Sequence, residues 1–178
     1  MHWFLFLILL IPAGLVFYQD LSSRSVLWYL FPLTAVLGFI NSHLQTGSWK
    51  ETLAYIFINS VFVLLQFVLL KLYFSLKNRD VTSKLINGKI GLGDLLFLLA
   101  ACFFFSPFNF LLFYCSSLLF AISFHWLFNK VFKTNALAAT VPLAGWMAIF
   151  LIVYIAFLQV TNNGLTKDDW ILNYLLYT

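Results

Sequence analysis

Two aspartates stand where a charged side chain meets a long apolar run. Asp20 follows Leu15-Val16-Phe17-Tyr18-Gln19, and Asp94 stands in Ile90-Gly91-Leu92-Gly93-Asp94-Leu95-Leu96-Phe97. The whole chain has only six acidic residues in 178. A carboxylate beside hydrocarbon is costly, so one that faces the interior of a helix bundle suggests a function. Asp20 and Asp94 are therefore the first candidates for chemistry.

A pair of carboxyl groups can hydrolyse a peptide bond. At hydrogen-bond distance the two groups share one proton, because both cannot be ionised cheaply. The ionised carboxylate takes a proton from water while the protonated one polarises the peptide carbonyl. This is the chemistry of aspartic proteases, and it predicts no metal, no cofactor and no cysteine nucleophile. In the alternative interpretation, Asp94 only caps the start of a helix.

Two glycines precede the second aspartate. Gly91 and Gly93 flank a single leucine directly before Asp94. Glycine permits unusual φ values and the close approach of another backbone. We therefore expect Gly91 and Gly93 to form a loop against which an extended substrate can lie. The alternative is that they only shape the entry to a helix.

The composition determines which elements must position these residues. The chain is 63% hydrophobic and 9% charged, with a mean hydropathy of +0.96, whereas soluble domains are about 45–50% apolar and about 25% charged. These values exclude a water-soluble monomer and a disordered chain. We expect an all-α polytopic membrane helix bundle in a lipid bilayer, with residues 1–178 as one transmembrane domain. The net charge of +4 fits loops beside anionic lipid and not a nucleic-acid surface.

The pattern of charges and turn residues predicts about six transmembrane helices. The uncharged stretch 95–129 is too long for one helix, and Ser106-Pro107-Phe108-Asn109 divides it. Asn59 and Gln66 are expected to form hydrogen bonds between helices. Thr161-Asn162-Asn163-Gly164 ends the last span, and Trp170 to Tyr177 is expected to be a short interfacial piece. The expected spans are 3–18, 26–42, 52–72, 93–105, 108–129 and 138–160.

The basic residues predict the orientation of the bundle. With six spans, 8 of the 10 basic residues fall in the first, third and fifth loops, and such loops are normally cytoplasmic. The N-terminus is then outside. The end of the first span and the start of the fourth share the cytoplasmic side, so we expect Asp20 and Asp94 to lie together there. The eight residues are Arg24, Lys71, Lys77, Arg79, Lys84, Lys89, Lys130 and Lys133.

These motifs resemble those of the GxGD membrane aspartyl proteases. Gly91-Leu92-Gly93-Asp94 at the start of a span, with an earlier aspartate at the cytoplasmic end of another, is their pattern. The chain length, the six spans and the N-terminal position of Asp20 are similar to type IV prepilin peptidases (leader peptidases). Tyr18-Gln19-Asp20-Leu21-Ser22-Ser23-Arg24-Ser25-Val26 and Thr140-Val141-Pro142-Leu143-Ala144-Gly145 also resemble segments of that family.

The resemblance implies a function. Asp20 and Asp94 would be the catalytic dyad, and Gly91 and Gly93 would bind the substrate. The substrate would be a prepilin or pseudopilin-like protein of a type IV pilus or protein secretion system. Its leader would be removed at the cytoplasmic face of a prokaryotic inner membrane.

The chain departs from the family pattern at several positions. Leu96 stands where the family commonly has lysine, and the proline expected soon after Asp20 is missing. The N-terminal Cys-x-x-Cys pairs of larger members are absent, so N-methylation of the product is not expected. The two cysteines, Cys102 and Cys115, are expected to be small core residues.

Three alternatives stay open at this stage. An ion-coupled carrier could use the two acids as proton relays, and an assembly factor could keep the scaffold without catalysis. Signal peptide peptidases and presenilins share Gly-Leu-Gly-Asp, but they need about nine spans and rank lower. His2, His43 and His125 lack the spacing of metal ligands.

Overall fold

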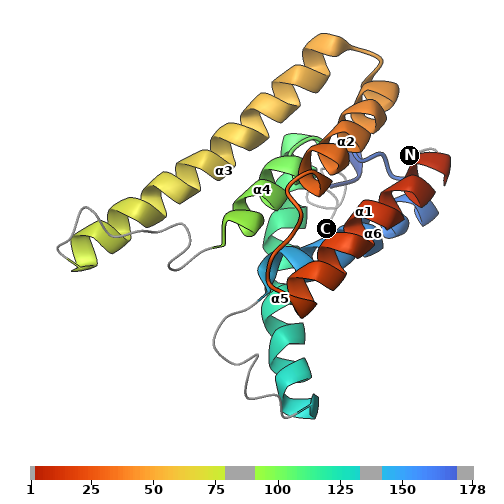
Figure 1. Cartoon of the computed structure of the whole chain (residues 1–178). Coiled ribbons are helices and arrows are strands. Elements are labelled where there is room, and N and C mark those ends of the chain that lie inside the picture. Colours follow the sequence, from red (N-terminus) through yellow and green to blue (C-terminus); the bar gives the residue numbers. More distant parts are fainter. Residues whose placement is uncertain (1–2, 79–90, 133–141, 172–178) are drawn as a thin grey trace.

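The protein is a bundle of α-helices. A computed structural model describes residues 3–78, 91–132 and 142–171, and no β-strand occurs in these ranges. The expected all-α membrane helix bundle is confirmed (Figure 1). The helices named within the described ranges are α1 (Trp3–Ser22), α2 (Leu30–Thr46), α3 (Trp49–Asn78), α4 (Leu92–Ala101), α5 (Pro107–Phe132) and α6 (Leu143–Val160).

The helices differ in their ability to cross a bilayer. Among the described residues, α1, α3, α5 and α6 are long and apolar enough to cross one. The helix α2 has 17 residues and α4 has only 10. At 1.5 Å per residue, α4 covers about 15 Å, roughly half of the hydrocarbon layer. The expected fourth span, 93–105, is therefore wrong in length, because the helix ends at Ala101.

Polar side chains from neighbouring helices stabilise the non-helical backbone that follows the short helix α4. Asn59 Nδ2 on α3 donates hydrogen bonds to the carbonyl oxygens of Cys102 (3.2 Å) and Phe105 (2.9 Å). Ser42 Oγ on α2 donates to the carbonyl oxygen of Phe103 at 2.7 Å. Non-helical backbone inside a membrane protein is tolerated only where such partners exist. The role expected for Asn59 is confirmed. Gln66 on α3 also meets the expectation, because its side chain forms a hydrogen bond with Tyr114 on α5, although its buried Oε1 has no hydrogen-bond partner among the described residues.

The predicted break between the fourth and fifth spans is confirmed, but α5 begins at Pro107, one residue before the expected start at 108, and the last three residues of the predicted turn are helical. Proline suits the first position of a helix, because the N–H it lacks would have no partner there. The carboxylate of Asp168 accepts hydrogen bonds from Ser106 Oγ and from the backbone N–H (3.3 Å) and Nδ2 (3.1 Å) of Asn109. The segment after α6 therefore folds back and caps the start of α5.

This returning segment packs into the bundle. Leu165 is buried, and Trp170 packs against the core while its Nε1 donates to Asn109 Oδ1 at 3.2 Å. Trp170 is thus half-buried against the bundle, and the expectation of an interfacial piece stays a prediction. Residues 172–177 lie outside the described part of the chain.

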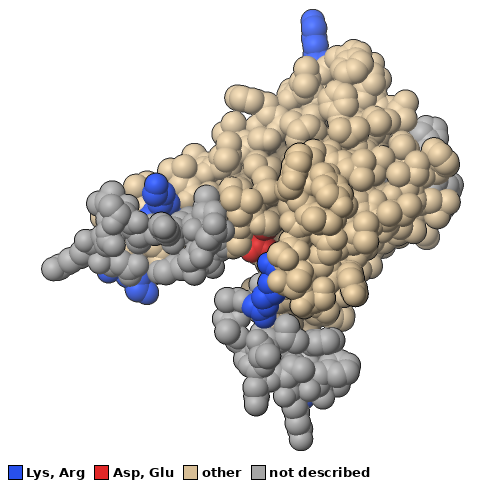
Figure 2. Space-filling model, viewed as in Figure 1, with Lys and Arg blue, Asp and Glu red and all other residues tan. Residues whose placement is uncertain are grey.

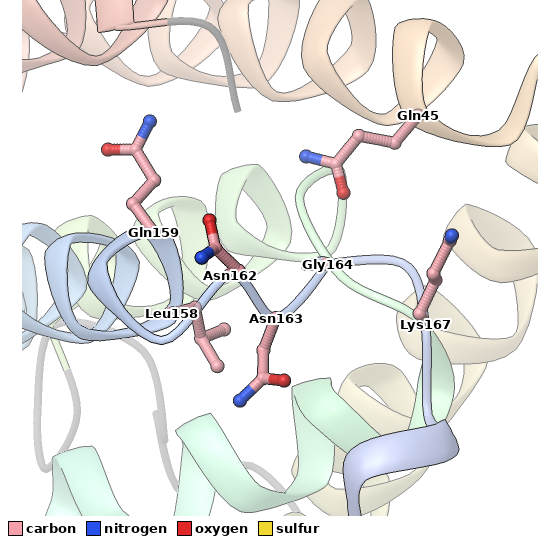
Figure 3. Close-up of a pocket in the computed structure, with 7 residues that line it drawn as sticks. All are labelled: Gln45, Leu158, Gln159, Asn162, Asn163, Gly164 and Lys167. Atoms are coloured by element: carbon pink, nitrogen blue, oxygen red, sulfur yellow. The ribbon is translucent and has the colours of Figure 1, made fainter.

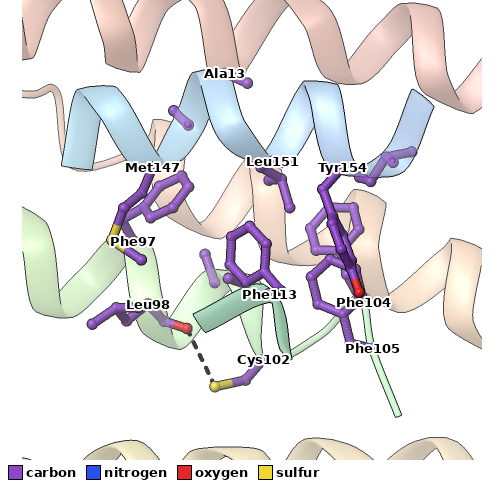
Figure 4. Packing of buried hydrophobic residues seen from close by; sticks show 14 of the residues in the cluster. Ala13, Phe97, Leu98, Cys102, Phe104, Phe105, Phe113, Met147, Leu151 and Tyr154 are labelled. Carbon is purple, nitrogen blue, oxygen red and sulfur yellow. Dashed lines mark hydrogen bonds between the residues drawn. The ribbon is translucent and has the colours of Figure 1, made fainter. Parts of the chain in front are cut away.

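The core is centred on α6. Its packing is most extensive against α1, which runs antiparallel to it, and α5 follows (Figure 1). Met147 and Leu151 on α6 meet the buried Phe97 of α4 and Phe113 of α5 (Figure 4). The helix α3 lies at the edge of the bundle, and most of its large apolar side chains are exposed. Those side chains would face lipid.

The two cysteines have different environments. Cys102 is fully buried and its Sγ donates to the carbonyl oxygen of Leu98 at 3.2 Å (Figure 4). It is a small core residue, as expected. Cys115 is exposed on α5, so the same expectation is wrong for it. A helix that is apolar on all faces does not reveal which face is buried.

The helices alternate in direction, so the odd-numbered ones end at one end of the bundle. The C-terminal ends of α1, α3 and α5 point to the same end of the molecule (Figure 1). Lys71 and Lys77 lie near the end of α3, and Lys130 lies near the end of α5. Figure 2 shows basic side chains at this end, next to an acidic spot in a hollow. Arg79, Lys84, Lys89 and Lys133 fall outside the described residues.

Candidate active site

Asp20 and Asp94 meet at the first turn of α6. Asp20 Oδ2 accepts a hydrogen bond from the backbone N–H of Gly145 at 2.6 Å. Asp94 Oδ1 accepts one from the backbone N–H of Ala144 at 2.9 Å. Successive Cα atoms are about 3.8 Å apart, so the two carboxyl groups are neighbours. The expected proximity of Asp20 and Asp94 is confirmed.

The two aspartates make the hydrogen bonds that the side chain of an N-cap residue normally makes. Pro142 is the N-cap residue of α6, and it offers no side-chain hydrogen bond. The second and third N–H groups of a helix are those that an N-cap side chain normally accepts. In α6 these belong to Ala144 and Gly145, and carboxylates from α4 and α1 accept them instead. The positive end of the helix dipole also favours negative charge at this position.

Gly145 permits the close contact between α1 and α6. A Cβ atom at Gly145 would lie 3.2 Å from both Cβ and Oδ2 of Asp20, and 3.4 Å from the carbonyl oxygen of Phe17. Such contacts are tighter than ordinary van der Waals separations. The absence of a side chain at Gly145 is therefore what lets the last turn of α1 bring Asp20 against the start of α6.

Asp94 also stabilises the start of its own helix. Its Oδ2 accepts a hydrogen bond from the N–H of Gly91 at 3.2 Å, and its own N–H donates to the carbonyl oxygen of Gly91 at 3.2 Å. The N-cap of α4 is Gly91 and Asp94 is the third residue of the helix, so the prediction of Asp94 as the N-cap is wrong in position, although its side chain does bond to the N-cap backbone. One carboxylate oxygen caps α4 while the other binds α6, so the side chain is held at both oxygens.

The glycines before Asp94 have ordinary backbone angles. Gly91 is extended, with φ −67° and ψ 140°, and Gly93 lies inside α4. Among the described glycines only Gly47 has a positive φ, so the expectation of unusual φ values at Gly91 and Gly93 is wrong. Gly91 is exposed, and a Cβ atom there would lie 3.1 Å from Asp94 Oδ2. An approaching chain can therefore come close to Asp94 over Gly91.

Burial and charge both act on the pair. Asp20 is only 9% exposed, and Asp94 is half-buried. The charge of Asp20 acts on Asp94, and the charge of Arg24 acts on Asp20. Two acids this close, one of them almost closed off from solvent, make ionisation of both groups costly, and the N–H groups of Gly145 and Ala144 offset part of that cost.

Sequence reasoning missed the donors that hold the pair. Ala144 and Gly145 were not predicted as site residues, because nearly every residue type has a backbone N–H group and the sequence does not show which of them donate to a side chain. The one available signal was the resemblance of Thr140-Val141-Pro142-Leu143-Ala144-Gly145 to the start of the last span in prepilin peptidases. In that stretch Pro142 cannot supply a side-chain cap, so two N–H groups are left for side chains from elsewhere.

No protein-family model, no curated protein and no solved structure matches the chain. The contacts of Asp20 and Asp94 and the sequence motifs around them are therefore the features that bear on function.

Proposed function

We propose that this protein is a membrane aspartic endopeptidase of the prepilin peptidase type, with Asp20 and Asp94 as its catalytic pair. The single observation that carries the proposal is their joint attachment to the neighbouring N–H groups of Gly145 and Ala144. Two acids from different helices, at one end of an apolar bundle, are held at a common point. That arrangement is what two-carboxylate hydrolysis of a peptide bond requires.

The reaction needs only the two acids, water and the substrate. The ionised carboxylate takes a proton from water, whose oxygen bonds to the carbonyl carbon of the scissile peptide. The protonated carboxyl group gives its proton to the carbonyl oxygen. When the resulting tetrahedral diol collapses, the C–N bond breaks, the protonated acid of the pair gives its proton to the leaving nitrogen, and one diol hydroxyl gives its proton to the ionised acid, so the pair again shares one proton.

The substrate we propose is a prepilin or pseudopilin-like protein. It has a polar leader followed by an apolar helix, so its cleavage site lies at a membrane surface. The pair lies at one end of the bundle, where Gly91 and Leu92 are exposed. The basic ends of α3 and α5 point the same way, and this supports a cytoplasmic position in an inner membrane.

Leader removal from a co-expressed prepilin tests the proposal. Asp20→Asn and Asp94→Asn are the informative variants, because an amide oxygen can still accept the N–H of Gly145 or Ala144 but the amide cannot share the proton. We expect each variant to lower the cleavage rate by at least about a hundredfold. The matched control is Asp169→Asn, at an exposed position, which should cleave normally. All three variants should accumulate in the membrane to the same level.

A second candidate function is favoured by the same contacts. Because Asp20 and Asp94 take over the N-cap of α6, they would also stabilise a catalytically inactive assembly factor. Full processing by both asparagine variants in a host lacking other leader peptidases would reject catalysis and favour that role. Proton-coupled flux through reconstituted protein, lost in the same variants, would instead favour an ion-coupled carrier.

A further inference from the structure

A polar recess lies at the end of the bundle away from Asp20 and Asp94. Its volume is about 360 Å³, within the range of small-ligand sites. The end of α2 and the turn that follows α6 form its walls (Figure 3). The lining residues are Gln45, Leu158, Gln159, Asn162, Asn163, Gly164 and Lys167.

The chemistry of the recess contrasts with that of the rest of the chain. Four carboxamide side chains and one ammonium group gather in a protein that is 63% hydrophobic. In Figure 3, the side chains of Gln159, Asn162 and Lys167 point to the side of the turn on which Gln45 lies. The side chain of Asn163 points to the opposite side. None of the lining residues is acidic. The nearby carboxylate of Asp168 is held by Ser106 and Asn109 instead.

The position of Lys167 in the recess is defined by the backbone around it. Its N–H donates to the carbonyl oxygen of Gly164 at 3.3 Å. A Cβ atom at Gly164 would lie 3.1 to 3.3 Å from the Cβ, Cγ and Cδ atoms of Lys167. The aliphatic stem of Lys167 therefore rests on Gly164, and its charged end reaches beyond the turn.

The recess lies about one membrane thickness from the aspartates. It begins at the C-terminal end of α6, whereas Ala144 and Gly145 lie in the first turn of that helix. Eighteen residues rising 1.5 Å each span about 27 Å, close to the ~30 Å of the hydrocarbon layer. The recess is thus at the headgroup level of the opposite membrane surface.

Groups of both signs surround the recess. Lys167 supplies a positive charge and several N–H donors. The C-terminal ends of α2 and α6, which carry partial negative charge, point to the same place. The exposed Asn162 adds a carboxamide oxygen, whereas Gln45 Oε1 already accepts hydrogen bonds from the N–H (3.4 Å) and Oγ1 (3.3 Å) of Thr166. A ligand with only negative charge would suit Lys167 but not the helix ends. A zwitterion with a phosphate and a hydrogen-bonding ammonium group would suit both.

Apolar surface continues from the recess along the bundle. Phe157 and Val160 on α6 are 53% and 75% exposed, and Leu44 on α2 is 55% exposed. These residues are sequence neighbours of the lining residues Leu158, Gln159 and Gln45, so they lie at the same level of α6 and α2 as the recess. A ligand in the recess would therefore have hydrocarbon-compatible surface beside it, which fits the acyl chains of a lipid.

We propose that this recess binds the headgroup of an aminophospholipid such as phosphatidylethanolamine. The phosphate would contact Lys167, and the ammonium group would contact the carboxamide oxygens and the C-terminal carbonyl groups of the two helices. The acyl chains would lie along α2 and α6. This binding is independent of the chemistry of Asp20 and Asp94.

Lipid retention tests the proposal. The full-length protein is reconstituted in vesicles of equal parts dioleoyl-phosphatidylethanolamine, -phosphatidylglycerol and -phosphatidylcholine, and the lipids that remain bound after mild detergent extraction are counted by native mass spectrometry. Phosphatidylcholine is the control lipid, because it is also zwitterionic but its quaternary ammonium group cannot donate hydrogen bonds. We expect phosphatidylethanolamine to be enriched over both other lipids.

Two variants connect the retention to the recess. Lys167→Gln keeps most of the stem over Gly164 but removes the charge, and should weaken phosphatidylethanolamine retention about tenfold. Asn162→Gly removes a carboxamide while accepting the positive φ of 56° at Asn162, and should weaken it less. Lys50→Gln is the control, with the same charge change at the start of α3, outside the recess.

The outcomes separate clearly. Displacement of the lipid by millimolar O-phosphoethanolamine but not by inorganic phosphate would support recognition of the zwitterionic headgroup. Equal retention of the three lipids would overturn the proposal. Equal loss in the Lys167→Gln and Lys50→Gln variants would also overturn it, as would displacement by inorganic phosphate alone.

Discussion

Asp20 accepts a hydrogen bond from the backbone N–H of Gly145 at 2.6 Å, although the two residues lie near opposite ends of the chain. This contact fixes the last turn of α1 to the first turn of α6. Asp94 makes the matching contact with Ala144. The start of α6 is therefore the element on which the geometry of the pair depends.

Gly145→Ala should disturb the pair directly. The new Cβ atom would lie 3.2 Å from Asp20 Cβ and Oδ2, so α1 or Asp20 must shift, at a cost of about 1–3 kcal/mol. We expect a lower midpoint of thermal unfolding in detergent and a marked loss of leader cleavage. Gly14→Ala on α1 is the control, because nothing lies within 4 Å of its Cβ position. That variant should gain about 0.5–1 kcal/mol. Similar activity in both variants would contradict the importance of this contact.

Leader cleavage should depend on pH in a bell-shaped manner. The proposed reaction needs one ionised and one protonated carboxyl group, held by Asp20 and Asp94 together. At low pH both become protonated and no base remains, and at high pH both become ionised and no acid remains. The rate against pH is measured with reconstituted protein and a purified prepilin. A rate that rises to a plateau at high pH would show that no protonated carboxyl group takes part.

The sequence predicted the pair because charge placement constrains a membrane chain strongly. Because the chain has few charged residues, the basic loops indicate how many spans there are and which loops share a side of the membrane. That count puts Asp20 and Asp94 on the same side. Pro107 likewise marked the start of α5, because proline removes an N–H and restricts the residue before it. These predictions depend on the local effect of proline or on the rule that basic loops lie on the cytoplasmic side.

The sequence failed where the answer depends on contacts between distant segments. The break after Ala101 depends on Asn59 and Ser42, which reach the carbonyl groups that follow α4 from two other helices. Asp168 looked like an ordinary residue of a polar tail, yet it caps α5. Helices that are apolar on every face carry no periodic signal for which side is buried, so Cys115 could not be placed.

Asn59→Leu should destabilise the bundle without changing the pair. It keeps a similar side-chain volume but removes the donor to the carbonyl oxygens of Cys102 and Phe105. Leaving a buried acceptor without a partner costs about 1–3 kcal/mol for each group. We expect a clearly lower unfolding midpoint. Ser116→Ala is the control, because Ser116 bonds only within its own helix and should change little. An unchanged midpoint for Asn59→Leu would mean that the carbonyl groups find other partners.

Asp168→Asn and Asp169→Asn form a matched pair that tests the cap of α5. Asp168 accepts hydrogen bonds from Ser106 Oγ and from two N–H groups of Asn109, while Asp169 is exposed. Loss of the charge at a helix start typically costs about 0.5–2 kcal/mol, so only Asp168→Asn should lower the unfolding midpoint. Because the cap also holds the turn that carries Lys167, this variant should retain less phosphatidylethanolamine than Asp169→Asn. Limited proteolysis after residue 160 should be faster in Asp168→Asn for the same reason. Equal proteolysis rates in the two variants would show that the other contacts of the returning segment, such as the hydrogen bond from Asn109 Nδ2 to the carbonyl oxygen of Lys167 (2.8 Å), hold it without the charge of Asp168.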